Sequence, residues 1–594
     1  MVKVKNQRGV SRRAMLLAGA GIGAFAQGWS ASPGAIAQDN SGTPGPHQAA
    51  GDSVILALPP GVALASGDDV SSSQPSPGGA LKLVRPGTNV SDFNPAAFGQ
   101  DMQIPLSYLE SLVCPDPRTL RPIPWLGRGW EWRDSGLMLA ISIRERVTWH
   151  DGSPLTANDA AFSFQVYQHD IDSAVAGLFG LVDTVQVVSA RELIVRFRER
   201  DASWLFNAAS LPIFSHEQYG EFWDAMPSSE RSLSGFDWTT TLPIGTGPWQ
   251  VADWDNSQVR FRRNQAYWQE PSWFDSLEIR VEGGSRTRLD AWVSGDSHIA
   301  WPVHVSDFAA IADAKGVLRP EPAAAVMFAA FNFANPLQPA GSLWTDPQVR
   351  RAASLAIDRE RYAAEVFGGY MRWDAVGAIA QPWANDPSLR TEPFDPATAS
   401  ALLAAAGWFD YDGDGVLEDI NGWPLRPVAI LREDSRPELA SVLARVARDL
   451  AGVGIGLTVE ALSAAAFAER WITRRDYDLI AYAYDQLPGF TDFDLYGSAW
   501  DIRSNAAGWN PGGYANPDAD AAIDEYLDAI SIIRQAIALR RLQRAVNDDL
   551  FALWFGFPHD LVLVADEVAG YRPDMAWQTA RTRELWQAID PTSP

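Results

Sequence analysis

The stretch that decides the fold lies at residues 147–159 and reads VTWHDGSPLTAND. Its Asp151-Gly152 pair is a turn signal. Thr156 has the residue type of a helix N-cap, and Asp159, three residues later, suits the positive end of the same helix. The stretch therefore predicts a turn followed by a helix that opens at Thr156.

Working outward, residues 137–143 alternate between two faces, with Leu and Ile on one of them. This period of two predicts a strand, and the run at 81–84 predicts another. Amphipathic patterns predict helices at 349–357, 399–406, 439–450 and 521–550. One further apolar run predicts a strand at 455–459. Strands and helices that alternate along the chain indicate a mixed α/β class.

Composition excludes several classes of protein. The chain has 594 residues, 48 Lys and Arg against 73 Asp and Glu, and a net charge of −25. Such a chain repels phosphate backbones, so we expect no nucleic-acid partner. The single cysteine, Cys114, excludes an internal disulfide framework and a cysteine-cluster metal site. The 25 Trp could serve a core or a ligand cleft, including one for sugars.

The N-terminus has the layout of an export signal. Arg12-Arg13 precede an apolar run at 14–26, and Ala35-Ile36-Ala37 offers small residues for cleavage. The paired arginines resemble a twin-arginine signal. The apolar run is shorter than the ~20 residues of a membrane span, so we expect a signal peptide at 1–37 and a protein that is not membrane-embedded. Residues 38–79 read as a flexible linker.

No strong catalytic signature occurs in the sequence. A Gly-x-Ser-x-Gly elbow, a His-Glu-x-x-His pair and a phosphate loop ending in Gly-Lys-Ser/Thr are all missing, and the seven histidines lack ligand spacing. We therefore expect that the chain binds no cofactor and is not an enzyme, and we assign no metal ligands. The abundant carboxylates mean that residue types alone do not exclude acid–base catalysis.

One loop has the spacing of metal ligands. Asp410, Asp412 and Asp414 alternate before Gly415, as at the start of a calcium loop, but Asn421 stands at the twelfth position, where a full loop carries Glu. Glu418 or Asp419 could substitute. A solvated acidic turn is the alternative interpretation, and the sequence does not decide between the two.

Several ordered blocks resemble one family, the family 5 solute-binding proteins of bacterial ABC importers, the oligopeptide, dipeptide and nickel class. The blocks that carry the resemblance are WEW at 130–132, the stretch 141–159, IGTGPW at 244–249, SGD at 294–296, the helix at 346–359 and LLAAAGW at 402–408. The resemblance covers about residues 81 to 586.

The resemblance implies a two-lobed α/β fold of the type II periplasmic binding proteins, in the large class with an extra inserted domain. Lobe I would comprise 80–117, 216–325 and 568–594, the inserted domain 118–215, and lobe II 326–567. The lobes would pivot shut over a ligand and deliver it unaltered to the transmembrane permease subunits of the transporter. A peptide or a similarly sized polar solute, a periplasmic location and a monomer are the corresponding expectations.

The resemblance also implies ligand-binding residues. The candidates are Phe98, Gln100 and Asp101 after the first strand, and Tyr482, Tyr484 and Asp485 at the end of a lobe II strand. Relatives use an aspartate near the position of Asp485 to pair with the amino terminus of a peptide. In this chain the separation in sequence between Tyr477-Asp478 and Asp485 is two residues shorter than in those relatives. A secreted enzyme, a receptor that feeds a sensor, and a binder of oligosaccharide or chelated metal remain as alternatives.

Overall fold

The computed structural model describes most of the chain beyond the expected linker. The described residues are 62–64, 75–87, 89–90, 93–97, 103–311, 315–323, 325–338, 343–486, 488–489, 492–505, 508, 510–572 and 582–588. The predicted signal peptide, most of the predicted linker, and the candidates Phe98, Gln100 and Asp101 lie outside these residues, so those expectations stay predictions.

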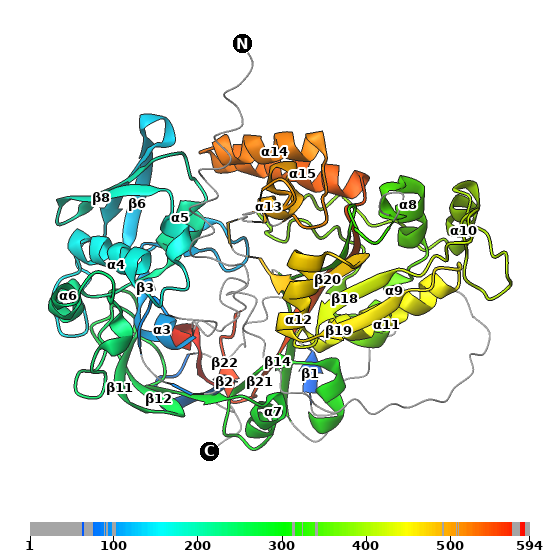
Figure 1. The fold of residues 1–594 in the computed structure, drawn as a ribbon. Coiled ribbons are helices and arrows are strands. Elements are labelled where there is room, and N and C mark those ends of the chain that lie inside the picture. The colour runs from blue at the N-terminus through cyan, green and yellow to red at the C-terminus, as the bar shows by residue number, and fades with distance from the viewer. Residues whose placement is uncertain are drawn as a thin grey trace, which may run out of the picture.

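Two lobes share one large mixed sheet of thirteen strands (Figure 1). Its first half, which we call the first lobe together with the elements packed on it, runs in the order β11 (Trp249–Asp255), β12 (Gln258–Arg263), β13 (Ser276–Glu282), β2 (Ala80–Pro86) and β14 (Ile299–Val303). Its second half, the second lobe, runs β16 (Ala325–Phe331), β20 (Leu479–Asp485), β18 (Val428–Arg432) and β19 (Thr458–Leu462). The predicted two-lobed α/β class is confirmed.

Two antiparallel strands pass side by side between the lobes. β15 (Gly316–Pro322) continues through Ala323 into β16, and the thirteen-residue strand β21 (Ala552–Val564) returns beside them. β21 pairs with β16 at Met327 to Ala330 and with β15 at Val317 to Pro322. These crossing strands form the hinge, and the short strand β17 (Met371–Arg372) adds to β21 at the same level.

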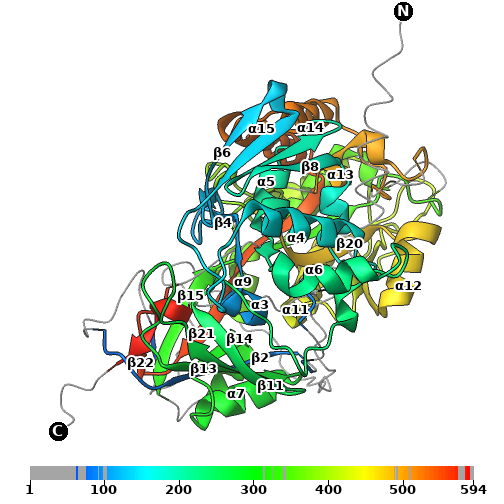
Figure 2. The same ribbon diagram turned by 90° about the vertical axis from the view of Figure 1, so that its left-hand side faces the viewer.

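A separate antiparallel sheet extends the first lobe. It is ordered β6 (Gly127–Arg133), β7 (Met138–Ile143), β9 (Glu192–Phe197) and β8 (Val182–Ser189). The predicted turn and helix lie beside it, since α4 (Ala157–His169) begins with a capping box between Thr156 and Asp159. Figures 1 and 2 both place this sheet at the end of the molecule where α14 and α15 lie. The domain boundaries 118 and 215 stay a prediction.

The second lobe has a different core on each face of its sheet. On one face α8 (Pro347–Leu355), α9 (Arg359–Phe367), α10 (Pro396–Ala405) and α11 (Pro437–Ala451) cover Met327, Ala329 and Ala481. On the other face α14 (Pro517–Asp528) and α15 (Ile532–Asp548) cover Val326, Phe328 and Ile480. The remaining α-helices of the described residues are α3 (Gln103–Tyr108), α5 (Trp204–Asn207), α6 (His216–Ala225), α7 (Ser285–Val293), α12 (Ala464–Ala468) and α13 (Phe493–Tyr496). The remaining short strands are β1 (Val62–Leu64), β3 (Glu110–Ser111), β4 (Val113–Pro115), β5 (Pro122–Pro124), β10 (Pro212–Ile213), β22 (Val568–Ala569) and β23 (Trp586–Gln587).

Two expected elements differ from the structure. The single helix predicted over 521–550 is wrong: Ala529 is extended and separates α14 from α15, which pack on each other. Both helices cover the same core, so their apolar residues follow one continuous pattern. The interruption between the two helices was therefore not visible in the spacing of apolar residues. The strand predicted at 455–459 begins at Thr458, because Gly454 at φ +85° opens a turn in which the Ile455 N–H still bonds the Leu450 carbonyl.

A buried carboxylate ties the first lobe together at Glu110. Four neutral donors bond it: Trp125 Nε1 at 2.7 Å, Thr246 Oγ1 at 2.8 Å, Tyr267 Oη at 2.7 Å and Trp268 Nε1 at 2.9 Å. Burial raises the pKa of Glu110, although each of the four donors works in the opposite direction. A buried acceptor with four partners fixes the relative positions of the segments that supply them.

Candidate functional site

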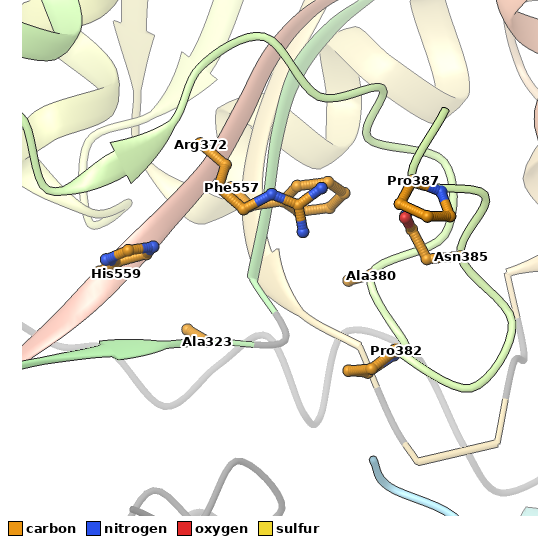
Figure 3. A pocket seen from close by; sticks show the side chains of 8 residues that line it. All are labelled: Ala323, Arg372, Ala380, Pro382, Asn385, Pro387, Phe557 and His559. Carbon is orange, nitrogen blue, oxygen red and sulfur yellow. The ribbon is translucent and has the colours of Figure 1, made fainter. Parts of the chain in front are cut away.

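A cavity of about 200 Å³ lies at the hinge (Figure 3). Three segments build it: the crossing strands, the short strand β17 and the loop that follows β17. The lining residues are Ala323, Arg372, Ala380, Pro382, Asn385, Pro387, Phe557 and His559. Because the crossing strands contribute to its wall, the shape of this cavity depends on how the lobes are set relative to each other.

The position of Arg372 follows from strand pairing. Arg372 stands directly opposite Phe557 in the antiparallel pair of β17 and β21, and its guanidinium lies 5.3 Å from the centroid of the Phe557 ring. Next to it, burial lowers the pKa of His559; the charge of Asp560 opposes this shift, and the charge of Arg372 adds to it. His559 is therefore neutral near pH 7, which leaves Arg372 as the charged member of the lining.

The loop after β17 is held by the end of β20. The Ala380 N–H donates to Gln486 Oε1 at 2.6 Å, and Gln486 Nε2 donates to Asp492 at 2.7 Å. Tyr484 donates its hydroxyl proton to the same Asp492 oxygen at 2.6 Å. This network couples the lining loop to the strand that carries three of the predicted ligand residues.

Those three residues lie on opposite faces of β20. Tyr482 and Tyr484 pack with Phe328 on the face that α14 and α15 cover. Asp485 follows the alternation of Ala481 and Ala483 toward the α11 side, where it is close enough to Arg436 to help raise the pKa of that guanidinium. The structure therefore does not bring the two tyrosines and Asp485 into one cluster, and their role in binding stays a prediction.

A second charged cluster joins the lobes beside the hinge. His304, which follows β14 of the first lobe, bonds through Nδ1 to Glu438 in the first turn of α11 in the second lobe. Arg436 donates to Asp560 of β21 at 2.9 Å. A narrow cavity between these groups is also lined by Tyr370.

The pKa values of the pair across the lobes move apart. Burial alone would lower the pKa of His304, but the hydrogen bond and charge of Glu438 outweigh it, and the pKa is raised. Burial alone would raise the pKa of Glu438, but His304 and Arg436 lower it to about 2. The two side chains therefore form an ion pair at mildly acidic pH.

The lobes also touch at the rim far from the hinge. The Phe206 ring of α5 stacks on Trp383 of the second lobe, with centroids 4.9 Å apart and planes 24° from parallel. The Gly489 N–H donates to Asn207 Oδ1 at 3.0 Å, and Arg200 reaches the Asp528 carbonyl at 3.5 Å. Contacts at both the hinge and the rim define a closed arrangement of the lobes.

The acidic loop is a compact structure with its own partners. Side-chain oxygens of Asp410, Asp412, Asp414 and Glu418 lie within 4.8 Å of one another. Asp410 accepts from the N–H groups of Gly413 and Gly415, and Asp414 pairs with Arg426 at 2.6 Å. These bonds account for the shape of the loop without a cation, so calcium binding stays a prediction.

Sequence reasoning missed most of the residues that build the hinge and the rim. Arg372, His304, Glu438, Phe206 and Trp383 come from five segments, and none stands in a recognisable motif. A signal was available only for Trp383, which lies in a loop rich in Pro, Ala and Asp. The others become neighbours only through tertiary packing.

Across the ranges that the structure describes, helices fall short of the length and apolar character that a bilayer crossing requires.

Comparison with known proteins gives a consistent picture. The oligopeptide-binding protein AppA of Bacillus subtilis is 21% identical over 448 residues, which is 74% of this chain and 79% of AppA. Di/tripeptide-binding protein 2 of Pseudomonas aeruginosa is 24% identical over 477 residues, 77% of this chain and 85% of the relative. These two relatives are therefore similar to this chain over most of their own length.

Solved structures share the fold. AppA in complex with a nonapeptide superposes with a TM-score of 0.63 at 19% identity, covering 87% of this chain and 100% of AppA. NikZ from Campylobacter jejuni in complex with Ni(L-His) superposes with a TM-score of 0.65 at 19% identity, covering 85% of this chain and 99% of NikZ. The sequence profile of the bacterial extracellular solute-binding proteins, family 5 Middle, matches residues 121–502. The chain belongs to family 5 of the bacterial extracellular solute-binding proteins.

Proposed function

We propose that this solute-binding protein captures a peptide, or a polar solute of similar size, between its lobes and delivers it to the permease of an ABC importer. The observation that carries the proposal is the cavity of about 200 Å³ at the crossing strands, where a bound solute would touch the hinge. Names of the relatives support a peptide, and the Ni(L-His) complex of NikZ supports a chelated metal as the second candidate.

The mechanism uses binding energy only to shift a conformational equilibrium. A solute that contacts both lobes favours the closed form by its difference in affinity for the two forms and by no more than that. The rim contacts and the ion pair at the hinge add a contribution that does not depend on the solute. The permease would then recognise the closed form, and the solute would be released unaltered.

Export fits the same role. The proposal places the mature chain in the periplasm after a twin-arginine-type signal at residues 1–37. The described residues carry no membrane-spanning helix, so the proposal assigns the membrane crossing to the permease subunits.

The test is to identify what the protein carries. Native mass spectrometry of the protein purified from its own organism should show a bound peptide, and adding that peptide at a hundredfold excess over Kd should stabilise the fold by about 2.7 kcal/mol. The recovered peptide should be chemically intact after incubation. Recovery of a metal chelate in place of a peptide selects the second candidate, and turnover of the ligand would overturn the binding role in favour of an enzyme.

A further inference from the structure

We propose that His304 and Glu438 form a proton-controlled latch between the lobes, in which protonation of His304 favours the closed form and tightens capture of the solute at mildly acidic pH. The inference rests on the proposed function, because it names a regulation of the same interlobe site. It assigns no new contact to the solute itself.

The first argument is where the two side chains are anchored. His304 directly follows β14, and its neighbours Val303 and Phe308 belong to the core cluster that also contains Trp292 of α7. Glu438 lies in the first turn of α11, whose apolar face packs on the sheet of the second lobe. Neither side chain belongs to the crossing strands, so a rotation of the lobes about those strands changes the separation of the two groups.

The second argument is that the pair is enclosed in the closed arrangement. The His304 side chain is 15% exposed and that of Glu438 is 13% exposed, and both line the narrow cavity beside the hinge. Water screens a charge pair in such a position far less than it screens a pair on the surface. Opening of the lobes would hydrate both groups and remove most of their mutual attraction. The charge of His304 therefore matters chiefly in the closed form.

The charged groups on the two segments of the latch oppose one another. Asp307 accepts the His304 backbone N–H at 3.0 Å and moves with it, so its charge acts on the imidazole in the open and the closed form alike. Arg436, two residues before Glu438, acts against protonation of His304. Burial raises the pKa of Glu438, but His304 and Arg436 lower it to about 2. This carboxylate therefore stays ionised at mildly acidic pH and above.

The elements packed against the latch bring further ionisable groups to the cavity. Asp560 of β21 is paired with Arg436 at 2.9 Å, and the charge of Asp485 at the end of β20 also acts on Arg436. Burial raises the pKa of Tyr370, whose hydroxyl therefore stays neutral. Burial lowers the pKa of His559, which therefore takes up a proton only below the range of an ordinary histidine. None of these shifts coincides with the titration of His304.

The direction of the effect follows from proton linkage. Burial lowers the pKa of His304, but the hydrogen bond and the charge of Glu438 outweigh burial and raise it in the closed form. Once Glu438 has moved away, this pKa returns toward the ordinary histidine value. A proton that binds the closed form more tightly than the open form favours closure. This contribution is fully present below the pKa of the open form and is lost as the pH rises through the raised pKa of the closed form.

The contacts at the rim give no such dependence on pH. The stack of Phe206 on Trp383 contains no ionisable group, and the Arg200 guanidinium bonds the backbone carbonyl of Asp528. An arginine keeps its charge from mildly acidic to alkaline pH. A change of affinity with pH that depends on His304 is therefore the signature of the latch and not of the rim.

The experiment measures binding of a random tripeptide library by calorimetry at about pH 5.5 and about pH 8.5. The proteins are the wild-type chain, His304→Gln, Glu438→Gln and the control His216→Gln, since His216 is exposed at the start of α6 in the first lobe. Glutamine keeps a hydrogen-bonding side chain and does not titrate in this range. The amino termini of the peptides titrate in the same way against all four proteins, so the comparison between proteins isolates His304.

The ratio of Kd at the higher pH to Kd at the lower pH should be about threefold or more larger for the wild type and His216→Gln than for His304→Gln and Glu438→Gln. Calorimetry at about pH 7 in two buffers with different heats of ionisation gives the protons taken up on binding. The wild type should take up more protons than His304→Gln, by up to about one per molecule.

Equal Kd ratios for the wild type and His304→Gln, or equal proton uptake, would overturn the inference and leave the peptide function standing. If the library binds the wild type at neither pH, the peptide function itself fails and the inference with it. Should His304→Gln not fold, the comparison of the wild type with Glu438→Gln decides in its place.

Discussion

Removing the aromatic contact at the rim, with Phe206→Ala, should weaken solute binding without disturbing either lobe. Phe206 is 3% exposed and Trp383 2% exposed in the closed arrangement, and they belong to different lobes. Opening the lobes would part the rings, so the contact stabilises only the closed form.

The magnitude follows from the geometry. A stacked aromatic pair contributes about 0.5–1.5 kcal/mol beyond burial, and burial of a Phe side chain about 1.5–3 kcal/mol. Phe206→Ala should therefore disfavour closure by about 2–4 kcal/mol. Since about 1.4 kcal/mol corresponds to a factor of ten, the Kd for a solute that binds the closed form should rise about 30-fold or more.

The assay is calorimetry with the solute recovered from the native protein, together with small-angle scattering of the unliganded chain. Phe206→Ala, Trp383→Ala and the double variant should show a coupling energy of about 0.5–1.5 kcal/mol. The matched control is Phe222→Ala, because Phe222 contacts Phe236 within the first lobe, with ring centroids 5.4 Å apart. The reasoning is refuted if Phe206→Ala changes Kd by less than about twofold, or no more than Phe222→Ala does.

Three further outcomes are expected. Glu110→Ala leaves four donors without their acceptor and should lower the free energy of unfolding in urea by about 3 kcal/mol or more; a loss under about 1 kcal/mol would contradict the role of this carboxylate. Glu438→Gln should lower the free energy of unfolding most between about pH 4.5 and 6.5. The contribution of Glu438 to stability is lost as the pH falls toward its pKa of about 2, and that of His304 is lost as the pH rises through its raised pKa. Urea unfolding of both proteins at several pH values measures this effect, and a difference that does not vary with pH counts against the ion pair. Asp485→Ala should weaken peptide binding about tenfold or more in the same calorimetric assay, and unchanged affinity removes Asp485 from the site.

Local signals in the sequence were sufficient for most elements. The capping box at Thr156 and Asp159, the alternation at 137–143 and the amphipathic pattern of α11 each depend on neighbouring residues, and the structure confirms them. The break between α14 and α15 was not predictable in this way, because both helices cover one core and so share one pattern.

The site depends on contacts that the sequence does not encode locally. Arg372 and Phe557 are 185 positions apart and meet through one short strand pair, and His304 and Glu438 meet only because the lobes do. Resemblance to a family indicated where the interlobe site would be and named residues at the end of β20, of which two tyrosines are half-buried and pack against the core of the second lobe.

The continuous sheet that runs through both lobes has a mechanical consequence. Rotation of one lobe against the other must be absorbed as a change of twist between neighbouring strands near the end of β15, the start of β16 and residues 556–559 of β21. Adjacent strands tolerate twists from about 10° to 35°, so adjusting two or three successive pairs by about 10° each yields a swing of about 20–30° with the ladder of backbone bonds intact. Opening of the lobes would then be an elastic and reversible twist of the sheet. Stiffening those few strand pairs would slow the opening and closing of the lobes without changing any contact to the solute.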